Sequence, residues 1–117
     1  PVMAPDVYVF TTSQTPADIP VIMRFEEAEG TTQIVARSTA EAASIPYECP
    51  CRMITLNVHS SLEAVGFIAL IATRLAEEGM GVNPVAGFFH DHIFVPENRA
   101  EDALKALIAM TSDKAPR

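Results

Sequence analysis

The sequence predicts an α+β fold, a small sandwich in which helices cover one face of an antiparallel sheet. The segment 53–60 alternates apolar and polar residues, as a half-buried strand does, and runs into a long apolar segment at 61–79 with the length of a helix. Two strand-like segments follow at 82–90 and 92–96 and meet at a tight His-Asp turn, at His90 and Asp91. This β-α-β-β order, followed by a second helical segment, specifies helices packed on one side of a sheet.

The N-terminal part of the chain contains further strand-like segments. Residues 6–12 are rich in β-branched and aromatic side chains, and a proline-punctuated loop follows. Segment 21–30 suits either a short helix or an extended conformation. Alternation typical of a strand resumes at 31–37.

A short helix is expected next, because Ser38 and Glu41 have the spacing of a capping box. It should end near Ser44. Residues 45–52 contain two prolines, which limit regular structure, and therefore predict a linker.

The helix expected at 62–76 is apolar nearly all round over its first three turns. A helix that lies on a sheet needs one apolar stripe only. Its second face is therefore expected to meet the N-terminal half of the chain or another subunit.

Pro84 predicts the position of its strand in the sheet. Proline cannot donate to a central ladder, so this strand should lie at an edge, as the second strand does in a β-α-β-β-α-β sheet of order 4-1-3-2. The last helix should begin near Asn98, and the residues after Thr111 are too few and too polar for a fourth strand. The N-terminal strand 6–12 is the candidate for that place, beside the strand 53–59.

Composition excludes several classes of function. The formal net charge is −7, which repels phosphate backbones and anionic lipids, so neither nucleic acid nor a membrane is expected as a partner. No apolar run is long enough to span a bilayer, and no secretory signal is visible.

Cys49 and Cys51 flank one proline, a spacing that strains a mutual disulfide, which fits a reducing cytoplasm. No cofactor is expected.

Three sequence blocks carry a resemblance to a known family. They are FEEAEG with TTQIV in the first half, ITLNVHSSLEAVGFIA, and NPVAGFFHDHIFVP. With these blocks the chain resembles an ACT-like family of small bacterial proteins built from two ACT-like halves. The resemblance implies a ferredoxin-like fold, with an incomplete half at 1–50 and an ACT-like domain at 51–117. It also implies kinship with regulatory domains that bind amino acids or other small metabolites.

The resemblance further implies a ligand site where the first strand of the C-terminal half meets its helix. A helix N-terminus offers free amides and a positive dipole to a carboxylate. Two serine hydroxyls add polar groups, and Gly66 permits close backbone approach. Asn83 from a neighbouring strand could reach an amino group. The candidate ligand-binding residues are His59, Ser60, Ser61, Leu62, Glu63, Gly66 and Asn83. The alternative is that the serine and the glutamate only cap the helix and that the glycine only packs.

A metal site is a second hypothesis. It would combine His59, His90, Asp91 and His92, although this spacing matches no familiar zinc signature. The alternative is that the histidines shape the turn while Asp91 bonds turn amides.

Catalysis finds little support in the sequence, because neighbouring residues of a strand, such as His59 and Ser60, point to opposite faces. We therefore expect a non-catalytic sensor or regulatory module that binds an amino acid and forms a homodimer. The alternative is a structural or oligomerisation module without a ligand, which would use the apolar helix as its interface.

Overall fold

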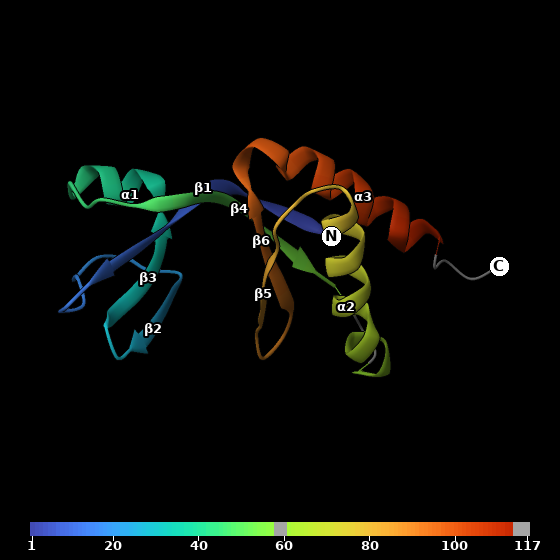
Figure 1. Ribbon diagram of the computed structural model, residues 1–117, viewed down its shortest axis with the longest axis horizontal. Coiled ribbons are helices and arrows are strands. Elements are labelled where there is room, and N and C mark those ends of the chain that lie inside the picture. Colours follow the sequence, from blue (N-terminus) through green and yellow to red (C-terminus); the bar gives the residue numbers. More distant parts are fainter. Residues whose placement is uncertain (58–60, 114–117) are drawn as a thin grey trace. The chain divides into compact units, whose positions relative to one another are not determined.

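The computed structural model describes residues 1–57 and 61–113, and for 61–65 and 111–113 it describes the backbone alone. The described residues form six strands and three α-helices (Figure 1). In chain order the elements are β1 (Val2–Ser13), β2 (Met23–Glu27), β3 (Gly30–Ala36), α1 (Arg37–Ala42), β4 (Glu48–Leu56), α2 (Ser61–Glu77), β5 (Asn83–Ala86), β6 (Asp91–Pro96), a 3-10 turn (Glu97–Arg99) and α3 (Ala100–Asp113). The α+β prediction is confirmed.

The strands are hydrogen-bonded in the order β2-β3-β1-β4-β6-β5. By contacts the chain divides into two compact units. We call Asp6–Cys51 the N-terminal unit, and Pro1–Pro5 together with Arg52–Arg117 the C-terminal unit. None of the helices among the described residues combines the length and the hydropathy that a bilayer crossing requires.

The C-terminal unit has the strand order β1-β4-β6-β5, which is the predicted order 4-1-3-2. β5 lies at the edge and carries Pro84, so the prediction from this proline is confirmed. The N-terminal strand does take the place beside β4, but the part of it that belongs to this unit is Pro1–Pro5 and not 6–12. Residues 8–13 pair with β3 in the N-terminal unit.

One face of this sheet is covered by α2 and α3. Ile54 and Leu56 alternate along β4, and together with Ile93 they form a core that both helices cover. Met3 packs against this core from the N-terminal strand. The guanidinium of Arg52 donates two hydrogen bonds to the carbonyl oxygen of Ala4, from Nε at 3.2 Å and from Nη2 at 2.8 Å. The start of the chain is therefore held to the C-terminal unit by packing and by polar contacts.

The outward face of α2, over the residues whose side chains are described, is formed mainly by small side chains. Gly66, Ala69 and Thr73 are exposed together with Leu70, whose exposed fraction is 44%. Most of these side chains are small, so Leu70 is the large aliphatic group of this face among residues 66–77, whose side chains the structure describes.

The N-terminal unit contains β2, β3, β1 and the beginning of β4, with α1 on one face. Val9 and Val35 are opposite each other in the ladder, and Ala40 of α1 packs on both. Segment 21–30, which the sequence left open, is extended: β2 pairs with β3 and ends at the turn before Gly30. Residues 14–22 form a loop where the C-terminal unit has a helix.

Gln33 holds this loop in place. Its side chain is 1% exposed, its Nε2 donates to the carbonyl of Ala17 at 3.2 Å, and its Oε1 accepts from the amide of Ala17 at 3.1 Å. One buried amide thus satisfies both backbone groups of a loop residue. Without the Gln33 side chain, the part-buried amide and carbonyl of Ala17 would have no hydrogen-bond partner there, which costs stability.

Three local predictions were wrong. Residues 48–52, expected to belong to a linker at 45–52, are the beginning of β4, and Pro50 lies inside this strand next to Cys49, whose φ is 57°. α1 begins at Arg37, and its N-cap residue Ala36 makes no side-chain cap hydrogen bond, because β3 runs directly into the helix and leaves Ser38 inside the first turn. The carboxylate of Glu41 accepts a hydrogen bond from Tyr47 Oη at 3.0 Å and does not close a capping box. The tight His-Asp turn is also wrong, since Asp91 is paired with Ala86 in the ladder.

The β5–β6 turn consists instead of Gly87–His90, closed by a hydrogen bond from the Gly87 amide to the His90 carbonyl at 2.9 Å. The two phenylalanines of this turn, which looked like strand residues, are exposed. Asp91 therefore shapes the strand and not the turn.

Gln33→Leu is expected to destabilise the fold by about 1–3 kcal/mol. The reason is that the part-buried amide and carbonyl of Ala17 would both lose their hydrogen bonds to the Gln33 side chain. Urea unfolding measures this change. Gln14→Leu is the matched control, since Gln14 is exposed and makes a single hydrogen bond to the Glu29 carbonyl. Equal effects of the two substitutions would contradict the role given to Gln33.

Removal of Pro1–Pro5 is expected to destabilise the C-terminal unit by at least about 2 kcal/mol, from lost strand pairing and from the uncovered core next to Met3. Amide hydrogen exchange provides the measurement: β4 and β6 should lose protection. Unchanged protection in these strands would show that the N-terminal strand is dispensable.

Candidate functional site

The start of α2 is the place where the sequence predicted a ligand site. β4 ends at Leu56 and α2 begins at Ser61. His59 and Ser60 lie outside the described residues, and of Ser61, Leu62 and Glu63 only the backbone is described, as the first turn of α2. The first amides of a helix have no partner within it and carry the positive end of the helix dipole. This backbone can therefore receive a carboxylate.

Gly66 lies one turn further along the helix and is exposed. Apart from the two neighbouring residues and the backbone of the helix itself, no atom lies within 4 Å of a Cβ atom built on it. The glycine is therefore not required for packing inside this chain, and its backbone stays open to a group from outside.

Asn83 is not at the start of α2. It is the first residue of β5, is exposed, and pairs with Phe94. α2 has 17 residues and is about 26 Å long, and Asn83 follows the end of this helix, whereas the β5–β6 turn lies toward its beginning (Figure 1). The structure does not bring Asn83 and Gly66 together within one chain.

A contact that the sequence analysis did not find joins β4 and β6. The Thr55 hydroxyl and His92 Nδ1 are 2.9 Å apart, and both side chains are half-buried. Ile54, Leu56 and Ile93 face the helices, so the alternation of the strands puts Thr55 and His92 on the opposite face. The period-two pattern of each strand was visible in the sequence, but the register between the strands was not.

The residues of the proposed metal site do not gather in the described part of the chain. There, no group of three His, Cys, Asp or Glu side chains is close enough to hold an ion, and His59 is not among the described residues. The rings of His90 and His92 have centroids 6.4 Å apart. His92 Nδ1 is engaged with Thr55, and Asp91 is a ladder residue.

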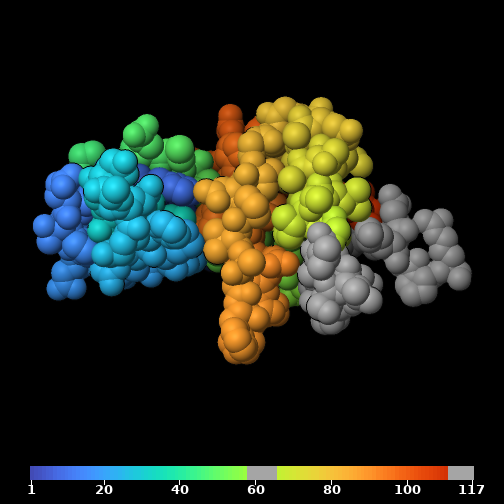
Figure 2. Space-filling model, turned by 60° about the horizontal axis from the view of Figure 1, so that its bottom comes forward, coloured from blue at the N-terminus to red at the C-terminus, as the bar shows by residue number. Residues whose placement is uncertain are grey.

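The tip of the β5–β6 hairpin presents an aromatic pair. Phe88 is 95% exposed and Phe89 is 83% exposed, and their rings meet edge to face with centroids 4.9 Å apart. Figure 2 shows the hairpin, in orange, projecting beside α2. Two large apolar side chains in water at one turn are unusual for a surface without a partner.

The two cysteines differ sharply in environment. Cys51 is buried, its thiol donates to the Tyr8 carbonyl at 3.3 Å, and burial, together with the nearby Cys49, raises its pKa from 9.0 to about 12. Cys49 is exposed and has a φ of 57°, a left-handed conformation that is uncommon for a residue with a side chain. Both are free thiols.

With this geometry, the architecture is that of a ferredoxin-like α+β fold. Two models described as ACT domain match the chain, one at residues 1–52 and one at residues 48–109. The chain belongs to the ACT-domain family. ACT domains are typically non-catalytic regulatory modules that bind small molecules such as amino acids.

Two solved structures resemble the chain closely in fold. A crystal structure from Vibrio cholerae, described as the protein of unknown function VC0802 and a possible transport protein, is 39% identical with a TM-score of 0.83, covering 91% of this chain and 84% of that chain. Protein Atu0741 from Agobacterium tumefaciens has a TM-score of 0.72 at 14% identity, covering 89% of this chain and 82% of that chain, and this likeness concerns the fold alone. A search of the curated proteins found no match.

Only Cys49 is expected to react quickly with Ellman's reagent in the native protein at about pH 8, because the thiolate is the nucleophile and the pKa of the Cys51 thiol is about 12. Both thiols should react in urea. Cys49→Ser should remove the fast phase. Two fast phases of equal size in the native protein would contradict the burial of Cys51.

Proposed function

We propose that this chain is a non-catalytic cytoplasmic regulatory module that binds a small amino-acid-like molecule at the start of α2. The observation that carries the proposal is the open backbone at Gly66, one turn from free helix amides. The amides would receive the carboxylate of the ligand, and Ser60, Ser61 and Glu63 would supply the polar groups around it.

The proposal includes a homodimer, and the position of Asn83 supports it. Because Asn83 lies at the end of the sheet away from the start of α2, it can serve this site only from a second chain. The ligand would then contact two chains and favour the assembly that presents both surfaces. Regulation would consist of this shift in population, with no chemical step.

Gly66→Ala separates ligand binding from stability. Alanine favours a helix interior by roughly 0.8–1.0 kcal/mol over glycine, and its methyl group meets no atom of the chain, so the free protein should become more stable. The same methyl group would obstruct a ligand at this backbone. We expect a lower affinity for the ligand together with a higher midpoint of unfolding.

Thermal unfolding against a panel of the natural amino acids tests this. A ligand at 100 times its dissociation constant should stabilise the native protein by roughly 2.7 kcal/mol, and Gly66→Ala should reduce that gain. Gly81→Ala is the control, because Gly81 is also exposed with open space around it but lies after α2. A panel without any shift would contradict the sensor proposal.

The alternative, an interaction module without a ligand, is favoured by one specific observation. Phe88 and Phe89 expose an aromatic pair at the hairpin tip. Sedimentation would then show assembly that depends on concentration, is lost in Phe88→Ser and does not respond to any amino acid. The sensor proposal requires assembly to strengthen with ligand.

A further inference from the structure

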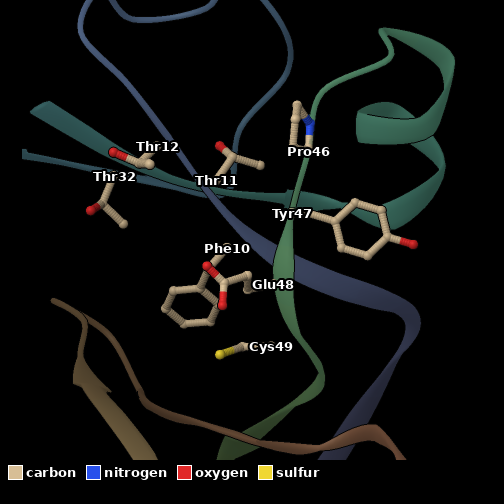
Figure 3. A pocket seen from close by; sticks show the side chains of 8 residues that line it. All are labelled: Phe10, Thr11, Thr12, Thr32, Pro46, Tyr47, Glu48 and Cys49. Carbon is tan, nitrogen blue, oxygen red and sulfur yellow. The ribbon is translucent and has the colours of Figure 1, made fainter.

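A second candidate site lies in the N-terminal unit, away from α2. It is a pocket of about 370 Å³, a size within the range of small-molecule sites. Its lining comes from β1, β3 and the segment that enters β4 (Figure 3). The side chains used in the argument are Phe10, Thr12, Thr32, Tyr47, Glu48 and Cys49.

The strand register fixes the face of the sheet on which the pocket lies. Val9 and Val35 point toward α1, where Ala40 packs on them. Phe10 and Thr12 lie one and three residues after Val9 along β1, so their side chains point to the opposite face of the sheet. Thr32 is the ladder partner of Thr12 and shares that face. These three side chains therefore occupy the face that α1 leaves uncovered.

The groups that line the pocket favour a positively charged ligand. Figure 3 shows the Phe10 ring, the Glu48 carboxylate and the Cys49 thiol on the same side of the β4 ribbon, with the Tyr47 ring on the other side. No lysine or arginine lines the pocket. Among the described residues the Glu48 carboxylate makes no hydrogen bond or ion pair, so its charge is available to a ligand.

The hydroxyl of Thr32 supports the same polarity. It donates its proton to the Glu27 carboxylate, which leaves the lone pairs of its oxygen for a donor from outside. An aromatic face beside a carboxylate attracts a cation through the ring quadrupole as well as through charge. A ligand carboxylate, in contrast, would meet Glu48 with no cation among the lining residues to offset the repulsion.

We infer that this pocket binds a small organic amine in its ammonium form. The nitrogen would lie between the Glu48 carboxylate and the face of Phe10, and N–H groups would donate to Glu48 and to Thr32. The apolar part of the amine would cover Phe10. This ligand class differs from that of the start of α2, where the helix amides favour an anionic group, so the chain would carry two sites of different chemistry.

Cys49 provides a direct reporter for the pocket. Its exposed thiol lines the pocket, whereas the Cys51 thiol is buried, so a bound molecule should slow the alkylation of Cys49 alone. Iodoacetamide labelling of the full chain, with fragment mass spectrometry to separate the two cysteines, measures the rate. Phenethylamine, 2-phenylethanol and 3-phenylpropanoate are probes with the same ring, an ethylene linker to the polar group and different charge.

We expect phenethylamine to slow the labelling of Cys49 several-fold at saturation, and the alcohol and the carboxylate to have little effect. Each rate is expressed relative to the same protein without a probe, which removes any change in the thiol itself. Equal protection by the alcohol, or no protection by the amine, would overturn the inference.

Glu48→Gln tests the carboxylate without a change in shape. An exposed ion pair contributes up to about fivefold to an equilibrium constant, and half-protection by phenethylamine should require a concentration higher by about that factor. Glu101→Gln, the same change at an exposed residue of α3, should leave protection unaltered. An unchanged half-protection concentration in Glu48→Gln would overturn the assignment, and this result is independent of the amino-acid panel because Cys49 reports on this pocket alone.

Discussion

The contact between the Arg52 guanidinium and the Ala4 carbonyl marks the constraint on which the rest of the structure depends. In the C-terminal unit, the strand beside β4 on the side away from β6 is the beginning of β1, and Arg52 of β4 is hydrogen-bonded to it. Residues Pro1–Pro5 occupy this position, and Met3 packs against the core of the unit. A strand from the opposite end of the sequence therefore completes the helix-covered sheet.

This constraint explains why β1 and β4 are the longest strands. β1 has 12 residues and β4 has 9, whereas the other strands have between 4 and 7. Each long strand passes through both compact units, because the unit boundaries fall after Pro5 and after Cys51. In the N-terminal unit the loop 14–22 replaces a helix, and the Gln33 amide supplies the order that helix packing would have supplied.

Much of the fold was predictable from the sequence because its signals are local. The alternation along β4, the apolar length of α2 and the proline of β5 each act within a few residues. The capping-box prediction failed at Ser38 because β3 leads into α1 without a gap, which no propensity of the serine reveals. The turn was misplaced because Phe88 and Phe89 have strand-like side chains yet stand in water.

The candidate sites were less predictable because they join distant positions. Thr55 and His92 are 37 residues apart, and Phe10 and Glu48 belong to strands that come together only in the folded sheet. The start of α2 could be proposed from the sequence, since a helix N-terminus has the same chemistry in any fold. The pocket in the N-terminal unit could not, because its polarity depends on which face each strand presents.

The early position of Met3 and Ala4 has a consequence for the order of folding. These residues precede their partners in the chain, because Arg52 of β4 follows Ala4 by 48 positions and the helices that cover the core come later still. The contact therefore closes a loop of nearly 50 residues, with the entropic cost and slow rate of non-local pairing. During synthesis the N-terminal unit can form as soon as β4 begins. Residues Pro1–Pro5 reach their final packing only after α2, β6 and α3 have also been made.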